Sequence, residues 1–236
     1  MKKNNNVINC IKGFLERAGV DMDPSDALAA FVHRSYLNES SDQDLENNER
    51  LEFLGDAVLE LVVTEFLYNK YTDKPEGELT ALRSALVRGK NLSKVAESLD
   101  IFECLLLSKG ESKATGKARG LILANTIEAI IGIIYIKLGL EKARDFINKH
   151  VLCIIEDIIS EKLYIDPKSD FQEKVQERDK TTPHYKIMEE KGPDHDKKFI
   201  SGVYISDRLI SKGEGYSKNQ AEQDAAQKAL DIEFKS

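Results

Sequence analysis

Hydrophobic residues recur at helical spacing through the first two thirds of the chain. Their return every three or four positions predicts amphipathic helices, and one stretch that is apolar nearly all round predicts a helix buried in the core. These helices are predicted over residues 6–18, 49–70, 121–136 and 141–164. No period-two alternation, the pattern of a half-buried strand, occurs before residue 165. The pattern therefore predicts an all-α domain over residues 1–165.

The periodicity changes after Asp166-Pro167, because proline disfavours the continuation of a helix. One further helix is followed by three alternating segments separated by turn residues, and then by a last helix capped by Ser217. The two helices are predicted over residues 169–180 and from 218 onward, and the strands over residues 184–190, 198–206 and 208–213. The order α-β-β-β-α predicts a small α+β domain over residues 166–236.

Three carboxylates interrupt the apolar pattern of the helix predicted from residue 49. Glu49, Glu52 and Asp56 are three and four positions apart, a spacing that places them on one face of a helix. Like charges at this distance repel one another, so a mostly apolar helix gains nothing from the stripe without a compensating cation. Oxygen-rich clusters suit Mg²⁺ or Mn²⁺. From the spacing alone, a solvated acidic edge of an amphipathic helix is an equally good interpretation.

The apolar helix over residues 121–136 contains two polar side chains, Asn125 and Glu128, on one face. Its length approaches that of a membrane span, but a charge within a bilayer is costly and rare. In a protein core Glu128 needs a partner, because an unpaired buried charge is unfavourable. The simplest arrangement brings this pair and the first acidic stripe together around one hard cation.

Four segments resemble the sequence motifs of the ribonuclease III family. The run NERLEFLGDAVL at residues 48–59 resembles the signature of that family, and HRSY, PEGELT and ANTIEAIIG fit its neighbouring motifs. The part from Asp166 onward resembles a double-stranded-RNA-binding domain. Together these segments span nearly the whole chain. The resemblance implies an all-α endonuclease domain followed by an α+β double-stranded-RNA-binding domain.

The resemblance also implies an activity: metal-assisted hydrolysis of phosphodiester bonds in double-stranded RNA, with structured precursors such as ribosomal RNA as substrates. Glu52, Asn125 and Glu128 are expected to hold Mg²⁺, with Mn²⁺ as a substitute. Asp56 and Glu128 are the expected catalytic residues, and Glu49 and Glu76 are auxiliary candidates. By residue type His33 is either a ligand or catalytic base or, as we favour, a hydrogen-bonded structural histidine, and the resemblance also implies that HRSY is scaffold. A homodimer is implied, in which each subunit cuts one strand and the products carry staggered 3′ overhangs. Phe53 is the candidate for packing across that dimer, with ordinary core packing as its alternative.

Asn125 departs from the family pattern, which usually has aspartate at this position. The amide keeps a carbonyl oxygen that can ligate Mg²⁺, but the site has one negative charge fewer. Glu52, Asp56 and Glu128 remain, so we expect activity to survive.

Three regions of the second domain correspond to the RNA contacts of double-stranded-RNA-binding domains. Gln172 and Glu173 offer polar groups to 2′-hydroxyls, and His195 is expected to reach a second minor groove. Lys218 starts the last helix, where backbone N–H groups also favour phosphate. A second basic residue is common in the family where this chain has Asn219, which weakens the phosphate contact.

Composition changes this picture little. The net charge is −7, so RNA affinity must come from local basic clusters. One such cluster, residues 109–119, is interpreted either as a solvated connector or as a contact to the RNA backbone. No signal peptide is evident, and the three scattered cysteines are interpreted as free thiols in a reducing cytoplasm. We therefore expect a cytoplasmic protein without membrane association.

Two other function classes fit part of the sequence. A dimer that holds double-stranded RNA without cutting it efficiently is compatible with the loss of charge at Asn125. A metal-dependent hydrolase of small phosphorylated substrates explains the acidic helices but assigns no role to the second domain.

Overall fold

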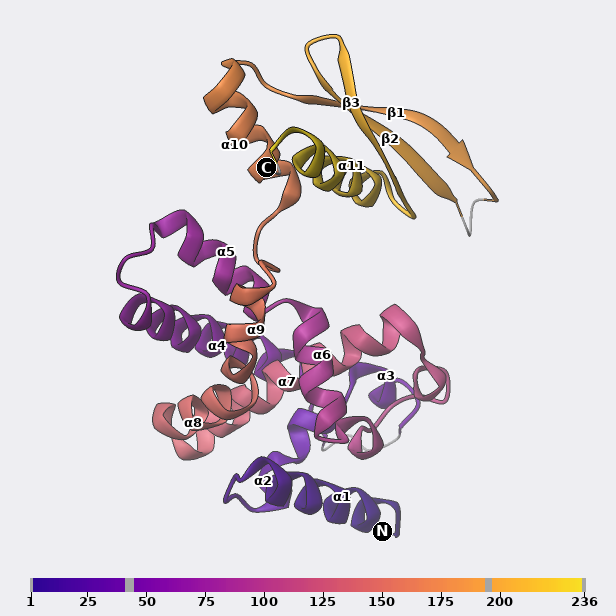
Figure 1. Cartoon of the computed structure of the whole chain (residues 1–236). Coiled ribbons are helices and arrows are strands. Elements are labelled where there is room, and N and C mark those ends of the chain that lie inside the picture. Colours follow the sequence, from indigo (N-terminus) through magenta and orange to yellow (C-terminus); the bar gives the residue numbers. More distant parts are fainter. Residues whose placement is uncertain (1, 41–44, 194–196, 235–236) are drawn as a thin grey trace. The chain divides into compact units, whose positions relative to one another are not determined.

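The computed structural model describes residues 2–40, 45–193 and 197–234, and the chain forms two compact units (Figure 1). The units are Met1–Glu161 and Lys162–Ser236. Both predicted fold classes are confirmed. The described part of the first unit contains helices and no strand, and the second unit has the order α-β-β-β-α.

The first unit consists of α-helices connected by loops and short 3₁₀ helices. Its α-helices are α1 (Lys2–Ala18), α2 (Pro24–Ala27), α3 (Arg34–Leu37), α4 (Glu49–Lys70), α5 (Glu76–Leu86), α6 (Gly89–Ser98), α7 (Gly116–Leu138), α8 (Leu140–His150) and α9 (Ile155–Ser160). The 3₁₀ helices are η1 (Leu28–Phe31), η2 (Ile101–Cys104), η3 (Glu111–Lys113) and η4 (Leu152–Ile154).

The single helix predicted over residues 141–164 is interrupted in the structure. α8 ends at His150, and the chain continues through η4 into α9. Val151, Leu152 and Ile155 are all buried at this point. On a continuous helix these three positions would lie within about 100° of one another, so the apolar pattern alone does not reveal the break at η4.

The core of the first unit is the crossing of α4 and α7, where two glycines allow the helix backbones to touch. A Cβ atom on Gly55 would lie 1.7 Å from the carbonyl oxygen of Glu128. A Cβ atom on Gly132 would lie 2.3 Å from the carbonyl oxygen of Leu51. No side chain fits at either position without moving a helix. The two glycines therefore set how closely the polar residues of α4 approach those of α7.

α7 is long and apolar enough to cross a membrane by length and composition, but 61% of its most apolar window is buried inside the unit. Eleven of its residues are buried, among them Ile122, Leu123 and Ile127. This burial is that of a core helix, as the apolar pattern predicted.

Cys10 and Cys104 form a disulfide, so the expectation of free thiols is wrong for these two residues. The bond joins α1 to η2 across a sequence separation of 94 residues. Only the tertiary packing of α1 against η2 brings the two cysteines together, and their spacing in the sequence carries no signal of it. Cys153 remains free and exposed.

Reduction of the Cys10–Cys104 disulfide is expected to destabilise the protein by about 2–4 kcal/mol, because the bond closes a long loop and restricts the unfolded chain. Thermal unfolding with and without dithiothreitol measures the effect. The Cys104→Ser variant should melt at the temperature of the reduced wild type, whereas Cys153→Ser should keep the wild-type response. Identical melting of the wild type in both conditions would contradict the expectation.

The second unit is an antiparallel three-stranded sheet with two helices packed on it. Its elements are α10 (Pro167–Asp179), β1 (His184–Lys191), β2 (Lys198–Ile205), β3 (Arg208–Gly215) and α11 (Lys218–Glu233), and the strand order is β1-β2-β3. The helices and strands meet in a core that contains Phe171, Val175, Val203, Ile205, Ala225, Ala226, Ala229 and Leu230. Alanines on α11 allow it to lie close to the sheet, and the Ser211 hydroxyl donates to the carbonyl oxygen of Ala225 at 2.5 Å.

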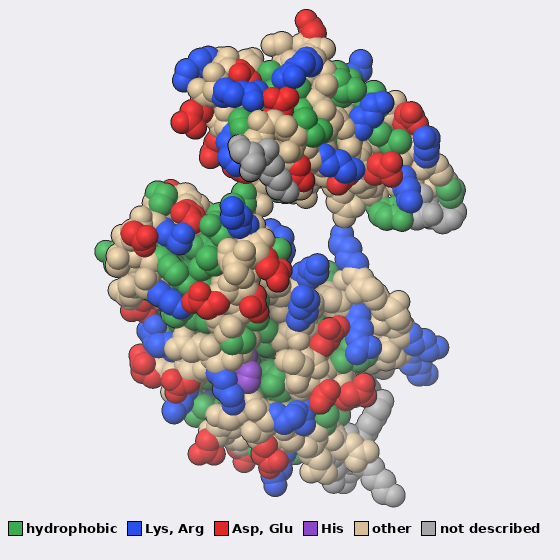
Figure 2. Space-filling model, in the orientation of Figure 1, with side chains coloured by type: hydrophobic (Ala, Val, Ile, Leu, Met, Phe, Trp, Pro, Cys, Tyr) green, Lys and Arg blue, Asp and Glu red, His purple; other side chains and the backbone are tan. Residues whose placement is uncertain are grey.

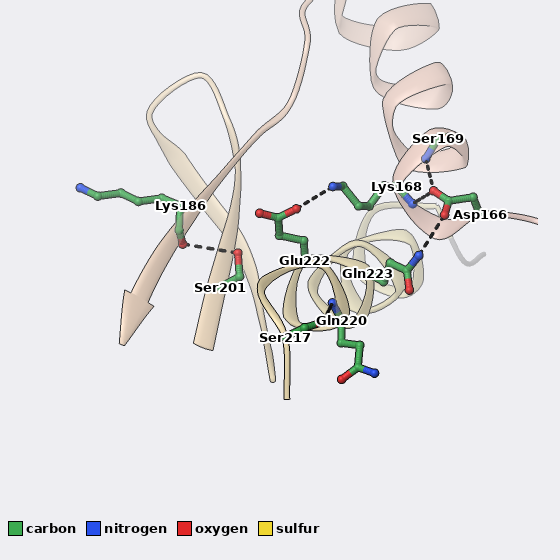
Figure 3. Close-up of polar contacts among 9 residues, drawn as sticks. All are labelled: Asp166, Lys168, Ser169, Lys186, Ser201, Ser217, Gln220, Glu222 and Gln223. Atoms are coloured by element: carbon green, nitrogen blue, oxygen red, sulfur yellow. Dashed lines mark hydrogen bonds and ion pairs between the residues drawn. The ribbon is translucent and has the colours of Figure 1, made fainter. Parts of the chain in front are cut away.

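The start of the second unit is tied to α11 by polar contacts (Figure 3). The Asp166 carboxylate caps α10 by accepting from the backbone N–H groups of Lys168 and Ser169 at 3.1 and 3.0 Å, and also accepts from Gln223 at 3.1 Å. Lys168 forms an ion pair of 2.6 Å with Glu222. These contacts fix α10 against α11, the two helices that carry three of the predicted RNA contacts.

Candidate active site

A cleft of about 460 Å³ opens beside the start of α4 and is lined mainly by polar side chains. Its polar lining residues are His33, Arg34, Asn48, Glu49, Glu52, Glu111 and Asn125, and its apolar ones are Ala118, Leu121 and Ile122. They come from α3, α4, η3 and α7 and from the residues just before α3 and α4. The cleft therefore gathers groups that are up to about 90 positions apart in the sequence.

Backbone contacts hold the beginning of α4 in place. Asn48, which is 2% exposed, donates from its backbone N–H to the carbonyl oxygen of Val32 at 2.9 Å and from its side chain to that of Ala30 at 3.3 Å. His33 in turn donates its backbone N–H to Leu106 at 3.1 Å. This buried network positions the first turn of α4, which carries Glu49 and Glu52.

The crossing of α4 and α7 brings Glu52 and Asn125 into contact. The Asn125 side chain forms a hydrogen bond with the Glu52 carboxylate. Since a carboxylate only accepts, the Asn125 NH₂ group donates, and its carbonyl oxygen stays free to bind a cation. The crossing thus places one carboxylate of α4 beside the amide of α7.

The Glu128 side chain is partly buried and lies near two other carboxylates, those of Asp56 and Glu52. Burial, and then the negative charges of Asp56 and Glu52, together raise its pKa to about 7. Burial also raises the pKa of Glu52, against the lowering effect of the Asn125 hydrogen bond. Glu52, Asp56 and Glu128 therefore act on one another electrostatically, and a positive charge placed among them would relieve both the repulsion and the cost of burial.

The donor set suits a hard divalent cation. It consists of carboxylate oxygens and one amide oxygen, the ligands that Mg²⁺ and Mn²⁺ prefer. Within residues 2–40, 45–193 and 197–234, no three His, Cys, Asp or Glu side chains are already grouped as a metal site. The residues thus fit a divalent cation by chemistry and charge, with Asn125 as an additional oxygen donor.

The two auxiliary candidates occupy different places. Glu49 lines the cleft, and its carboxylate accepts hydrogen bonds from the side chains of Arg34 and Asn47 at 3.3 Å each. Glu76 lies at the start of α5, accepts from the Thr80 hydroxyl at 3.1 Å, and lines a separate cleft near the far end of α4. Within one chain, the structure brings Glu49 to the acidic cluster but not Glu76.

Phe53 is 83% exposed, so core packing within the chain, the alternative interpretation of this residue, is wrong. Leu61 and Tyr68 on the same helix are 55% and 71% exposed. They follow Phe53 at intervals of eight and seven residues, which places all three along one side of α4. α4 thus has an apolar stripe that the rest of the described first unit leaves exposed.

Sequence reasoning missed Arg34 and Glu111 as residues of the cleft. The HRSY motif was expected to be scaffold, and the His33 side chain does cap α3 by accepting from the backbone N–H of Ser35 at 3.3 Å. His33 and Arg34 also line the cleft, and burial lowers the pKa of His33. The Ser35 hydroxyl has a structural contact as well, since it accepts from the backbone N–H of Ser108 at 3.1 Å. Glu111 lies within the lysine-rich segment before α7, where nothing in the sequence distinguishes it from a solvated acid.

The predicted RNA-binding residues of the second unit lie on its surface, except for His195, which is outside the described residues. Gln172 and Glu173 are exposed on α10. Lys218 begins α11 after the Ser217 cap, with its Nζ 3.7 Å from the Glu190 carboxylate (the cap is drawn in Figure 3). Figure 2 shows acidic and basic side chains mixed over the visible face of each unit, so local positions decide where phosphate binds.

Without metal, the stability of the first unit is expected to fall as the pH rises from 5 to 8. The pKa of Glu128 is about 7 in the folded protein against an ordinary 4.5, so the folded state binds the proton more tightly than the unfolded state. This contribution to stability is complete below the ordinary pKa and is lost as the pH passes through about 7.

Melting temperatures of the wild type and Glu128→Gln, measured in EDTA across this pH range, test the expectation. The glutamine variant should show a flatter pH dependence, because it has no proton to lose. Parallel curves for the two proteins would contradict the assignment.

Comparisons with known proteins match both units. A family described as "Ribonuclease-III-like" matches residues 23–155, and the "Double-stranded RNA binding motif" matches residues 167–232. The chain is 48% identical over 204 residues to "Ribonuclease 3" of Syntrophomonas wolfei, covering 85% of each chain. It is 43% identical to "Ribonuclease 3" of Desulforamulus reducens over 88% of this chain and 85% of that one.

A solved structure of similar fold is the nuclease domain of ribonuclease III from Campylobacter jejuni, reported for flexibility in its region of dimer formation. It is 37% identical, with a TM-score of 0.54, and the match covers 60% of this chain and 95% of that domain.

Proposed function

This chain belongs to the ribonuclease III family and is an endoribonuclease of double-stranded RNA, and from this premise we propose that Glu52, Asn125 and Glu128 hold its divalent metal ion. The observation that carries the proposal is electrostatic. Burial and the charges of Asp56 and Glu52 raise the pKa of Glu128 to about 7, a situation that a bound cation reverses. Mg²⁺ is the proposed ion, and Mn²⁺ its substitute, because all the donors are oxygens.

A divalent ion in such a site supplies an acidified water and neutralises charge on the scissile phosphate. The chain's own residues prepare for that chemistry. Asn125 orients the Glu52 carboxylate through their hydrogen bond. Asp56, which is exposed, completes the acidic cluster beside Glu128. Glu128, whose pKa is about 7 in the metal-free protein, would give up its proton when the cation binds, so its carboxylate would be charged as a ligand.

Glu49 and Glu76 are proposed as auxiliary residues with different requirements. Glu49 lines the same cleft as Glu52, so it can act within its own subunit. Glu76 lines a different cleft of the chain, so any catalytic contribution from it requires a second subunit.

The protein is proposed to work as a homodimer in which each subunit cuts one strand and leaves a staggered 3′ overhang. Support comes from Phe53, Leu61 and Tyr68, since several large apolar side chains left exposed along one side of a helix are typical of an interaction surface. The similar nuclease domain from Campylobacter jejuni, whose description names a region of dimer formation, supports it too.

The second unit is proposed to hold the duplex by its A-form shape, through Gln172, Glu173, His195 and Lys218. The proposed substrates are structured precursors such as ribosomal RNA, and the proposed location is the cytoplasm. The Cys10–Cys104 disulfide is unusual for a reducing compartment.

Cleavage of a long RNA duplex by metal-stripped protein tests the proposal. We expect no cutting in EDTA and short duplex products once Mg²⁺ is added. Binding of the duplex without cutting in Mg²⁺ would instead indicate an RNA-holding protein. Hydrolysis of a small phosphodiester with no effect on the duplex would indicate a hydrolase of small substrates.

Restoring the usual charge with Asn125→Asp should lower the Mg²⁺ concentration needed for half-maximal cleavage. The gain is modest, because a carboxylate among others is screened by an effective dielectric of about 20. The variant loses the hydrogen bond to Glu52 and gains repulsion, so its metal-free melting temperature should fall. A Mg²⁺ titration of cleavage and a melting curve in EDTA measure the two effects. If neither changes, Asn125 does not contact the metal.

A further inference from the structure

Arg34 is the only lysine or arginine among the described residues that line the catalytic cleft. The other charged groups of the cleft are acidic: Glu49, Glu52 and Glu111. An RNA strand that enters the cleft brings further negative charge. The positive charge of Arg34 therefore lies where the acidic groups of the cleft would otherwise repel the RNA strand.

The present partner of Arg34 holds it weakly. Its Nη1 lies 3.3 Å from one oxygen of Glu49, and the two side chains are 69% and 51% exposed. Such exposed pairs contribute little to stability, and a single long contact uses one of the five N–H donors of a guanidinium. A phosphate can replace Glu49 at little cost and can accept two parallel hydrogen bonds from the planar guanidinium.

The backbone that carries Arg34 is fixed on both sides. His33 donates its backbone N–H to Leu106 at 3.1 Å, and the Ser35 hydroxyl accepts from the backbone N–H of Ser108 at 3.1 Å. The backbone at Arg34 is therefore held in place while its long side chain extends from it, so the guanidinium can change partners without a change of fold.

We infer that Arg34 binds a phosphate of the RNA strand in the cleft and gives up Glu49 when it does so. The inference rests on the proposed site and adds to it a substrate-positioning residue in the first unit, outside the RNA-binding second unit. The exchange releases the Glu49 carboxylate at the moment when substrate arrives, which couples RNA binding to the availability of an auxiliary acidic group.

The test is the salt dependence of RNA binding in a Glu128→Gln background, which allows binding to be measured without cleavage. Arg34→Gln should weaken binding of an RNA duplex roughly tenfold or more and reduce the slope of log K against log salt by about one, the effect of one lost phosphate contact. Arg34→Lys should keep most of the slope but lose part of the affinity. It also serves as the second variant if Arg34→Gln does not fold.

Arg50→Gln is the matched control, because Arg50 is exposed near the cleft but does not line it. The slope of log K against log salt for this variant should stay at the wild-type value. An unchanged slope for Arg34→Gln overturns the inference. The inference is also overturned if Arg34→Gln weakens RNA binding in the presence of Glu49 but not in a Glu49→Gln background, because Arg34 would then act only by holding Glu49. Cleavage by the wild-type protein is assayed in parallel, so failure of the proposed site is seen separately as absence of metal-dependent cutting.

Discussion

Replacing Glu128 with glutamine is expected to abolish cleavage of duplex RNA while RNA binding persists. Glutamine keeps the shape and one oxygen of the side chain but removes the negative charge from a partly buried position beside Asp56 and Glu52. Preorganised charge of this kind is typically worth a factor of about 10²–10³ in rate when one group is lost, and a metal ligand is worth at least as much. The measurement is single-turnover cleavage of a long duplex at saturating Mg²⁺.

Glu97→Gln is the matched control for this change. Glu97 is an exposed carboxylate on α6 that does not line the cleft, so its loss should leave the rate unchanged. Gel-shift binding in EDTA, where no cutting is expected, should give the same RNA affinity for the wild type and Glu128→Gln. Substantial Mg²⁺-dependent cutting by Glu128→Gln would remove this residue from the proposed site.

A methyl group at Gly55 should have a large effect on stability and cleavage together. The new Cβ atom of Gly55→Ala would lie 1.7 Å from the carbonyl oxygen of Glu128 and 2.8 Å from the backbone nitrogen of Gly132, so α4 and α7 must separate. Overpacking of a core generally costs about 1–3 kcal/mol, and a clash with backbone belongs at or above the upper end of this range. Since Glu52 and Glu128 lie on either side of the same crossing, the metal site opens as the helices move apart.

Gly77→Ala is the control for the Gly55 substitution. Gly77 lies in α5 with no atom within 4 Å of the added methyl group, so alanine should be neutral or stabilising by up to about 1 kcal/mol. Chemical denaturation of the three proteins compares the effects. If Gly55→Ala is as stable as Gly77→Ala, the close contact of the two helices is not what holds the site together.

The helices and acidic positions could be predicted because they depend on local pattern. Three- and four-residue spacing placed Glu49, Glu52 and Asp56 on one helix, and the charge inside an apolar segment identified Glu128. The second unit followed from the change of periodicity after Asp166-Pro167. In each case the information lies within one or two turns of chain.

What could not be predicted depends on contacts between distant segments. Cys10 and Cys104 pair across 94 residues, and Glu111 enters the cleft from a segment whose composition is that of a basic connector. Arg34 was assigned to scaffold because the motif around it does not show which way its side chain points. Glu76 sits in a motif of the family, yet the fold of one chain places it in another cleft. Position in space, rather than residue type, decides all four.

Binding of Mn²⁺ to the metal-free protein, followed by electron paramagnetic resonance of the free ion, tests most directly whether the two acidic helices form the metal site. We predict saturable binding to the wild type, competition by Mg²⁺, and affinity lowered about tenfold or more in Glu128→Gln, in line with the loss of one charged ligand. Equal Mn²⁺ affinity in the wild type and Glu128→Gln would contradict the account and place the metal elsewhere.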